Sequence, residues 1–265
     1  MISYYLPLIS LVPCTDGHLA EWGTLPAVVL DADTADYGQY WCGVPDSANA
    51  SAILRSGWDD DFLYFAIEVR DDVLVADSAD IWRDDGIELG IDGLYDHIGS
   101  WFDDDHQFTL TFDGRVTDFG DPTDAVIAVT STLDGGWALE VAIAADGLGA
   151  GPLTVGKAMG FTFGLNDDDD GGNYESHLIW EGDSTNDSSI EYGRLLLTLA
   201  PASLGGFAWN DTDADRVQDG TENGISGVTL VLYHVVNDPV ASAVADANGF
   251  YRFEGLSPGI YTVMA

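Results

Sequence analysis

The stretch Leu63-Tyr-Phe-Ala-Ile-Glu-Val69 decides the fold class, because its apolar residues recur at every second position. A period of two places Leu63, Phe65, Ile67 and Val69 on one face of a β-strand. The same alternation returns at 87–91, 108–112, 137–143 and 161–163, and turn clusters rich in Asp and Gly separate these segments. No stretch carries a helical stripe. We therefore predict an all-β chain whose larger part is a β-sandwich of jelly-roll or immunoglobulin-like type.

Composition supports a globular protein with an extreme negative charge. The 265 residues are 46% apolar and include eight Trp, which is enough for real cores. Acids outnumber bases 46 to 8, giving a net charge of −38. Such a surface repels nucleic acid and anionic lipid, so neither nucleic-acid binding nor membrane insertion is expected. A salt-rich or calcium-rich medium would explain the acid excess, and so would specific metal sites; both favour an extracellular or cell-surface location.

The two cysteines, Cys14 and Cys42, lack the spacing of a zinc or redox site. Their sequence positions leave two alternatives open, one disulfide or two buried thiols. The apolar segment 4–12 is too short to cross a bilayer, and no basic residue precedes it as in a signal peptide. It is predicted to be a first strand.

A change of domain is predicted near Pro201-Ala-Ser203. We divide the chain into a larger sandwich at 1–200, a linker at 201–203 and a small β-domain at 204–265. The apolar core of a domain as small as 204–265 gives only marginal stability, so a bound metal would add needed stability.

The small domain contains a ladder of acids with the spacing of a calcium loop. Calcium prefers oxygen ligands, and a twelve-residue loop supplies them at fixed positions that end in a bidentate Glu. The carboxylates at these positions, with one main-chain carbonyl, belong to Asp211, Asp213, Asp215, Val217, Asp219 and Glu222. Arg216 stands where such a loop usually has Gly. The alternative is a solvated acidic turn in an acidic protein.

Two phrases of the small domain are similar to the SdrD B-type repeats of bacterial surface adhesins. The first is Gly206-Phe-Ala-Trp209 with the acidic ladder and the residues up to 230; the second is Asp246-Ala-Asn-Gly-Phe-Tyr-Arg-Phe253 with its continuation to 263. The resemblance implies a small prealbumin-like β-sandwich that Ca²⁺ stiffens into a spacer, with the acids above as ligands.

In the larger domain, two alternating strands carry polar residues on one face. Ile87, Leu89 and Ile91 point one way, so Glu88 and Gly90 share the other face. On the segment 106–112, the same reasoning places Gln107, Thr109 and Thr111 on one face. Trp82 lies just upstream and Trp180 later. Indoles beside carboxylate and amide groups suit a sugar, whose C–H face packs on the ring while its hydroxyls form hydrogen bonds. Buried tryptophans of a sandwich core are the competing interpretation.

Residues 12–199 resemble a family 9 carbohydrate-binding module, within the broader DOMON-like sandwiches. The matching phrases are Asp16-Gly-His-Leu-Ala-Glu-Trp22 and the segments 58–72, 82–92, 136–143 and 160–167. The resemblance implies that Trp82 stacks on a sugar and that Glu88 and Gln107 bind its hydroxyls. Thr109 stands where members that clamp a chain end carry Arg. Their second clamping Trp is absent from Asn186-Asp-Ser-Ser189, and Trp180 lies earlier.

The same resemblance implies structural calcium. Asp167, at a strand end, is the strongest candidate ligand, and other candidates are Asp16, Asp71, Asp72 and the run 168–170. Solvated turns are again the alternative.

These observations favour a non-catalytic, extracellular carbohydrate-binding module joined to a calcium-stabilised spacer, within a secreted or cell-surface protein. Its expected partner is a polysaccharide or oligosaccharide, with neighbouring domains or subunits of a surface assembly as further partners. A structural or adhesive surface protein, or a filament subunit without sugar binding, is the alternative.

The chain is not expected to be an enzyme, although it suits the accessory part of a glycoside hydrolase. A hydrolase would need two carboxylates roughly 5 to 9 Å apart, and so many acids make that criterion uninformative. A haem-binding variant lacks supporting Met and His spacing.

Overall fold

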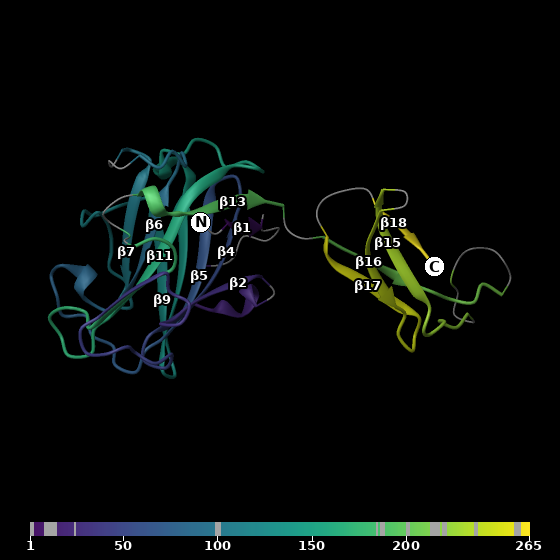
Figure 1. Ribbon diagram of the computed structural model, residues 1–265, viewed down its shortest axis with the longest axis horizontal. Coiled ribbons are helices and arrows are strands. Elements are labelled where there is room, and N and C mark those ends of the chain that lie inside the picture. Colours follow the sequence, from purple (N-terminus) through teal and green to yellow (C-terminus); the bar gives the residue numbers. More distant parts are fainter. Residues whose placement is uncertain are drawn as a thin grey trace. The chain divides into compact units, whose positions relative to one another are not determined.

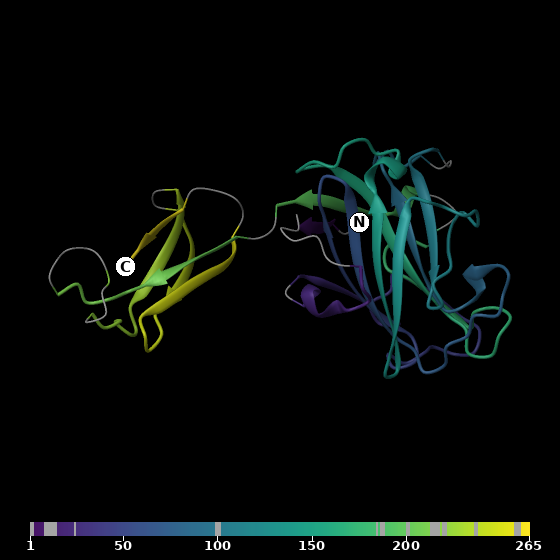
Figure 2. The same cartoon turned by 180° about the vertical axis from the view of Figure 1, so that it is seen from behind.

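The alternating segments of the sequence form the long strands of two stacked sheets. A computed structural model describes residues 3–7, 15–23, 25–98, 102–183, 185, 189–199, 202–212, 218, 222–235, 238–256 and 261–265. The chain divides into two units, Met1–Thr198 and Leu199–Ala265. Both units are built from strands, which confirms the all-β prediction (Figures 1 and 2).

The eight-stranded sheet of the first unit, here the front sheet, carries most of the polar residues predicted above. Its main order is β1-β13-β11-β6-β7-β8, and β12 joins β11 to β3. The strands are β1 (Ser3–Pro7), β3 (Tyr37–Tyr40), β6 (Gly86–Asp92), β7 (Asp105–Thr111), β8 (Val116–Asp118), β11 (Ala158–Asp167), β12 (Ser176–Ile179) and β13 (Gly193–Thr198). β1 runs parallel to β13, and the other pairs are antiparallel.

The five-stranded back sheet has the order β2-β4-β5-β10-β9. Its strands are β2 (Ala27–Leu30), β4 (Ser51–Trp58), β5 (Phe62–Arg70), β9 (Val126–Leu133) and β10 (Gly136–Ala144). Among the described residues of this unit, four short 3-10 helices connect strands, namely η1 (Leu19–Trp22), η2 (Ile81–Arg83), η3 (Ala145–Leu148) and η4 (Ser189–Glu191). No helix in the described part of the chain is long and apolar enough to span a membrane.

The core lies between the two sheets. Ile87, Leu89 and Ile91 of β6 are fully buried there, as the alternation predicted. Phe65 of β5 stacks on Phe161 of β11 with ring centroids 5.3 Å apart, so the sheets are in direct contact. All seven residues of β6 are buried. The polar face of the front sheet is therefore also covered, which the alternation alone did not indicate.

The second unit contains two small sheets. β14 (Ala202–Phe207) pairs with β17 (Phe250–Leu256), and β15 (Thr229–Val235) lies between β16 (Asp238–Val244) and β18 (Thr262–Met264). Its small core consists of Leu230, Leu232, Ala245, Phe253 and Leu256. Cys42 in the first unit is exposed, and Cys14 lies outside the described residues, as does most of the predicted calcium loop.

The hairpin between β9 and β10 contains a glycine whose backbone conformation can be tested by substitution. Gly136 has φ 146°, and a Cβ there would overlap the carbonyl oxygen of Val69. We expect Gly136→Ala to lower the free energy of unfolding by at least about 2 kcal/mol, because it adds a steric clash to an unfavourable φ.

Gly135→Ala is the matched control. Gly135 also has a positive φ, 72°, but a Cβ there meets nothing within 4 Å. Denaturant unfolding of the control should show a loss of only about 1 kcal/mol. Equal losses in the two variants would contradict the role of the Val69 carbonyl.

Candidate functional site

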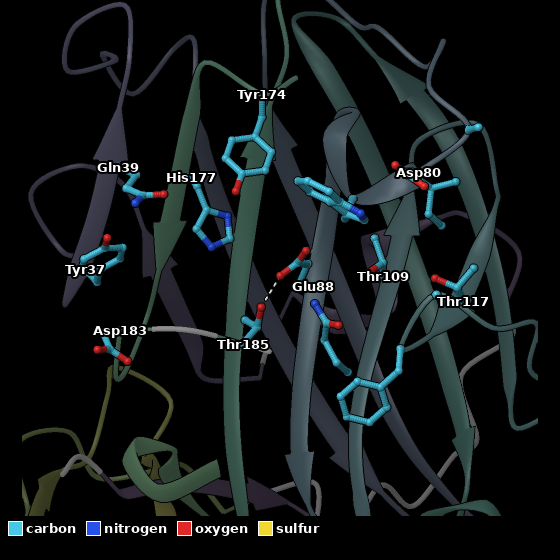
Figure 3. Close-up of a pocket in the computed structure, with 16 residues that line it drawn as sticks. Tyr37, Gln39, Asp80, Glu88, Thr109, Thr117, Tyr174, His177, Asp183 and Thr185 are labelled. Carbon is cyan, nitrogen blue, oxygen red and sulfur yellow. Dashed lines mark hydrogen bonds between the residues drawn. The ribbon is translucent and has the colours of Figure 1, made fainter. Parts of the chain in front are cut away.

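A pocket of about 450 Å³ lies on the outer face of the front sheet. Its floor crosses the sheet from β3 to β8, because side chains of these strands that face away from the core point into it. Figure 3 shows these side chains. The strands contribute Tyr37, Gln39, Glu88, Gln107, Thr109, Thr117 and His177, and the connecting segments contribute Trp82, Phe119, Tyr174, Asp183 and Thr185.

Strand register places three polar residues of the floor in one row. Glu88 on β6 lies opposite Thr109 on β7, and Thr109 lies opposite Thr117 on β8. Directly opposed residues share a face of the sheet, so the row is a consequence of backbone pairing. Figure 3 shows Glu88, Thr109 and Thr117 in this order across neighbouring strands. In the adjacent row, Gln107 lies opposite Gly90.

Glu88 is held in place by two neutral donors. Asn166 on β11 donates from Nδ2 to Glu88 Oε1 at 3.2 Å, and the Thr185 hydroxyl donates to Oε2. The side chain is 4% exposed. A carboxylate offers about four acceptor positions, so two hydrogen bonds leave capacity for a ligand. Glu88 is thus an oriented acceptor at the pocket floor.

Asn166 also fixes two neighbours of Glu88. Its Nδ2 donates to the main-chain oxygen of Trp82 at 2.8 Å, and its Oδ1 faces Nδ1 of His177 on β12. Burial lowers the pKa of His177, so its imidazole is neutral at neutral pH. With Nδ1–H donating to Asn166, Nε2 of His177 is an acceptor.

Aromatic rings line one side of the pocket. Trp82 is 37% exposed, and the Arg83 guanidinium lies 4.4 Å from its ring centroid. The ring of Tyr174 meets that of Trp82 edge-on, with centroids 5.9 Å apart. It stacks against the His177 ring, with centroids 5.2 Å apart. Contact between the exposed indole surface and water is unfavourable. A ligand with an apolar face would displace that water by packing on the ring.

Four of the five residues predicted for sugar binding line this one pocket, namely Trp82, Glu88, Gln107 and Thr109. Trp180 does not: it is 6% exposed and packs in the core against Phe161 and Phe163, so we leave it out of the site. The space left by Gly90 is filled by the Tyr192 ring.

Sequence reasoning missed Asn166, His177, Tyr174 and Thr185. Asn166 alternates with Gly164 on the polar side of β11, a signal that could have placed it there. His177 needed the pairing of β12 with β11, and Tyr174 and Thr185 lie in irregular segments without any periodic signal.

Acidic clusters lie around the end of β11, where Asp167 and Asp168 follow Asn166. Oxygens of Asp71, Asp167 and Asp169 lie within 4.8 Å of one another, and so do those of Asp77, Asp84 and Asp168. Asp167 Oδ1 and Asp168 Oδ2 are buried, and neither forms a hydrogen bond in the described part of the protein. Clustered hard oxygens with unsatisfied acceptors fit a divalent cation such as Ca²⁺. The second cluster is partly neutralised by Arg115, whose guanidinium pairs with Asp84 at 2.7 Å.

These clusters join the two segments that carry the aromatic side of the pocket. Asp71, Asp77 and Asp84 belong to the segment 71–85, which bears Trp82. Asp168 and Asp169 begin the segment 168–175, which bears Tyr174. The main-chain N–H of Asp168 donates to Asp85 Oδ1 at 2.6 Å, so the two segments also touch directly.

In the second unit, only residues 211, 212, 218 and 222 of the predicted calcium loop are described. Asp213, Asp215, Val217 and Asp219 lie outside the described residues. Glu222 is buried, and its Oε1 accepts from the N–H of Thr212 at 2.6 Å. Glu222 Oε2 is buried and forms no hydrogen bond within the described residues. A buried carboxylate oxygen with open acceptor capacity fits a cation ligand at the closing position of the loop.

Family models match both units, which confirms the resemblances predicted from the sequence. Residues 23–199 match the model described as carbohydrate family 9 binding domain-like, and residues 202–265 match the SdrD B-like domain. Endo-1,4-beta-xylanase A of Thermotoga maritima is 33% identical over 179 residues, which are 66% of this chain and 16% of that enzyme. Serine-aspartate repeat-containing protein F of Staphylococcus epidermidis is 43% identical over 61 residues, 23% of this chain and 4% of that protein.

Among solved structures, the chain resembles a carbohydrate binding module family 9 from Caldicellulosiruptor kristjanssonii in complex with cellotriose. The TM-score is 0.64 at 19% identity, covering 82% of this chain and 100% of that chain. At that identity the likeness shows the fold. The chain spans only a small part of the length of the xylanase and of the serine-aspartate repeat protein.

The cluster around Asp167 generates a prediction about pH. Burial and neighbouring carboxylates raise the pKa of Asp167 to about 6 and that of Asp71 to about 8. Above pH 4 the folded, cation-free protein holds protons that the unfolded chain has released, so its stability falls as pH rises toward 8. A bound cation removes this loss, because it stabilises the ionised carboxylates. Calcium should therefore raise the melting temperature of the first unit more at pH 8 than at pH 5.

Thermal unfolding in chelator and in calcium, at both pH values, measures this difference. Asp167→Asn keeps the size of the side chain and removes its charge, so the calcium response should shrink in that variant. An equal calcium response at pH 5 and pH 8 would contradict the prediction.

Proposed function

The chain belongs, through residues 23–199, to the carbohydrate family 9 binding domain-like family, and from this we propose that its first unit binds a sugar in the pocket around Glu88. The observation that carries the proposal is the pairing of an oriented, buried carboxylate with a half-exposed indole. Glu88 is fixed by Asn166 and Thr185, and Trp82 is fixed by its main-chain contact with Asn166. A fixed carboxylate and an exposed aromatic ring in one pocket suit a pyranose, which has an apolar C–H face and hydroxyl groups around its edge.

Each polar or aromatic side chain of the pocket would make a different contact with a sugar. The exposed indole of Trp82 would pack on the C–H face of a sugar ring, while Arg83 packs on the indole. Glu88 would accept from sugar hydroxyls, Gln107 would donate and accept, and Thr109 would add a hydroxyl. No Lys or Arg lines the pocket within the described residues, which favours a neutral saccharide over an acidic one.

We propose binding without turnover. The related xylanase carries this region in 16% of its length, as an accessory part would be carried, and the family description is that of a binding domain. A purely structural or adhesive role would leave the burial and orientation of Glu88 without a purpose. The pocket therefore favours a saccharide ligand over a scaffold that has lost its site.

Calcium is proposed as the cofactor of both units. In the first unit, Asp71, Asp167 and Asp169 would hold it and so join the segments that bear Trp82 and Tyr174. In the second unit, the ligands would be Asp211, Asp213, Asp215, Val217, Asp219 and Glu222. Bound there, the cation would stiffen a small domain whose apolar core is limited.

We further propose an organisation into a sugar-binding domain at 1–200, a linker at 201–203 and a spacer at 204–265, placed outside the cell. The similarity of the spacer to a staphylococcal serine-aspartate repeat protein supports a surface setting. The net charge of −38 suits a medium whose salt or calcium screens repulsion.

Calorimetry with cello- and xylo-oligosaccharides tests the sugar site. Trp82→Ala should abolish measurable binding, because it removes the stacking surface, while Trp180→Phe should leave binding unchanged because Trp180 lies in the core. Asn166→Leu should weaken binding about tenfold or more, since Glu88 loses a donor and its orientation. Absence of heat with every glycan in the wild-type protein would refute the proposal.

Chelation tests the spacer. Removing calcium should lower the melting temperature of the second unit, and Asp213→Ala or Glu222→Gln should abolish that response. Gln retains the shape of Glu222 but lacks the charge needed at the closing position. Identical melting curves with and without chelator would count against a calcium site there.

A further inference from the structure

Phe119 combines a strained backbone with an exposed ring at the pocket. It follows β8 directly, has φ 47°, and is 40% exposed. A positive φ is unfavourable for a residue that carries a Cβ, because the Cβ approaches the following carbonyl oxygen. Tyr95 and His97 are the other non-glycine residues with positive φ in the described chain, and neither lines the pocket.

The turn that contains Phe119 normally selects small or polar residues. Asp118 and Asp121 exchange main-chain hydrogen bonds of 2.8 and 2.9 Å, which leaves Phe119 and Gly120 as a two-residue hairpin loop. Both loop residues have positive φ, 47° and 83°, as in a type I′ turn. Asn, Asp or Gly is favoured at the first of these positions. Local preference therefore does not account for Phe at 119.

The strained turn is pinned to β7 at several points. The N–H of Phe119 donates to the Gln107 carbonyl at 3.0 Å. Asp118 Oδ1 accepts from the N–H of Gln107 at 3.2 Å, and Asp118 Oδ2 lies 2.8 Å from Nδ1 of His106. Backbone strain persists where surrounding contacts over-determine it, and such sites often serve ligands.

The position of Phe119 separates it from the Trp82 and Glu88 end of the pocket. Gln107 on β7 lies opposite Gly90 of β6 on one side, and on the other side its carbonyl accepts from the N–H of Phe119. Phe119 is thus two strands away from β6, a main-chain separation of roughly 10 Å at the usual strand spacing. That separation exceeds the width of one sugar ring. A ring held by Trp82 and Glu88 would leave the surface beside Phe119 for a second one.

We propose that Phe119 is the apolar surface of a second sugar position, so that the pocket binds a saccharide of at least two units across β6, β7 and β8. This inference rests on the proposed sugar binding at Trp82 and Glu88. The strain at Phe119 is the cost of presenting an aromatic ring at a turn that would otherwise carry Asn or Gly.

The variant Phe119→Gly tests the ring without destabilising the fold. Glycine accepts a positive φ, so the variant should melt at the same temperature as the wild type or higher. Its affinity for cellotriose or xylotriose should fall about tenfold, while its affinity for glucose or xylose should stay within twofold. Phe119→Trp should retain trisaccharide affinity, and Phe102→Ala, which removes another exposed ring outside the pocket, should change neither affinity.

The outcomes distinguish this inference from the function it rests on. If the wild type binds saccharides and Trp82→Ala abolishes binding, but Phe119→Gly changes no affinity, the second position is refuted and the sugar site stands. Equal losses for monosaccharide and trisaccharide in Phe119→Gly would also refute it, because they assign Phe119 to a single position. Wild-type protein that binds no saccharide would overturn both.

Discussion

The buried side-chain amide of Asn166 joins the elements of the pocket, and the site geometry depends on it. One end donates to Glu88 and to the main chain of Trp82, and the other faces His177. An amide suits this place because it offers donors and an acceptor on a short stem. A carboxylate would set a second negative charge against Glu88 and leave the Trp82 carbonyl without its donor, whereas an apolar side chain would remove all three contacts.

The end of β11 therefore organises more than one feature of the first unit. Asn166 serves the pocket, Asp167 and Asp168 belong to separate acidic clusters, and the N–H of Asp168 is bonded to Asp85. Part of the acid excess is thus structural: it lies where segments bearing Trp82 and Tyr174 meet. Carboxylates this close repel each other unless a cation or a proton intervenes. A cation or proton bound at these clusters would therefore act on both segments at once.

The sequence predicted those parts of the structure that depend on short-range pattern. Alternation placed Glu88, Gln107 and Thr109 on one face, because side chains two apart on a strand point the same way. It failed where long-range pairing or irregular segments decide the outcome. His177 enters the pocket only through the pairing of β12 with β11, and Tyr174 is placed by a segment with no periodicity. Trp180 satisfied the composition of a sugar site, yet its ring packs against Phe161 and Phe163, since an indole fits a core as well as a surface.

The pairing of β13 has a mechanical consequence for a chain whose second unit begins at Leu199. β13 ends at Thr198 and is hydrogen-bonded along its length to parallel β1 on one side and to antiparallel β11 on the other. The indole of Trp58 in the back sheet also donates to the Thr198 carbonyl at 2.9 Å. Tension applied along the axis of β13 would load these bonds in shear, together, instead of opening them one at a time. The last strand of the first unit is thus arranged to resist force that acts along its own axis.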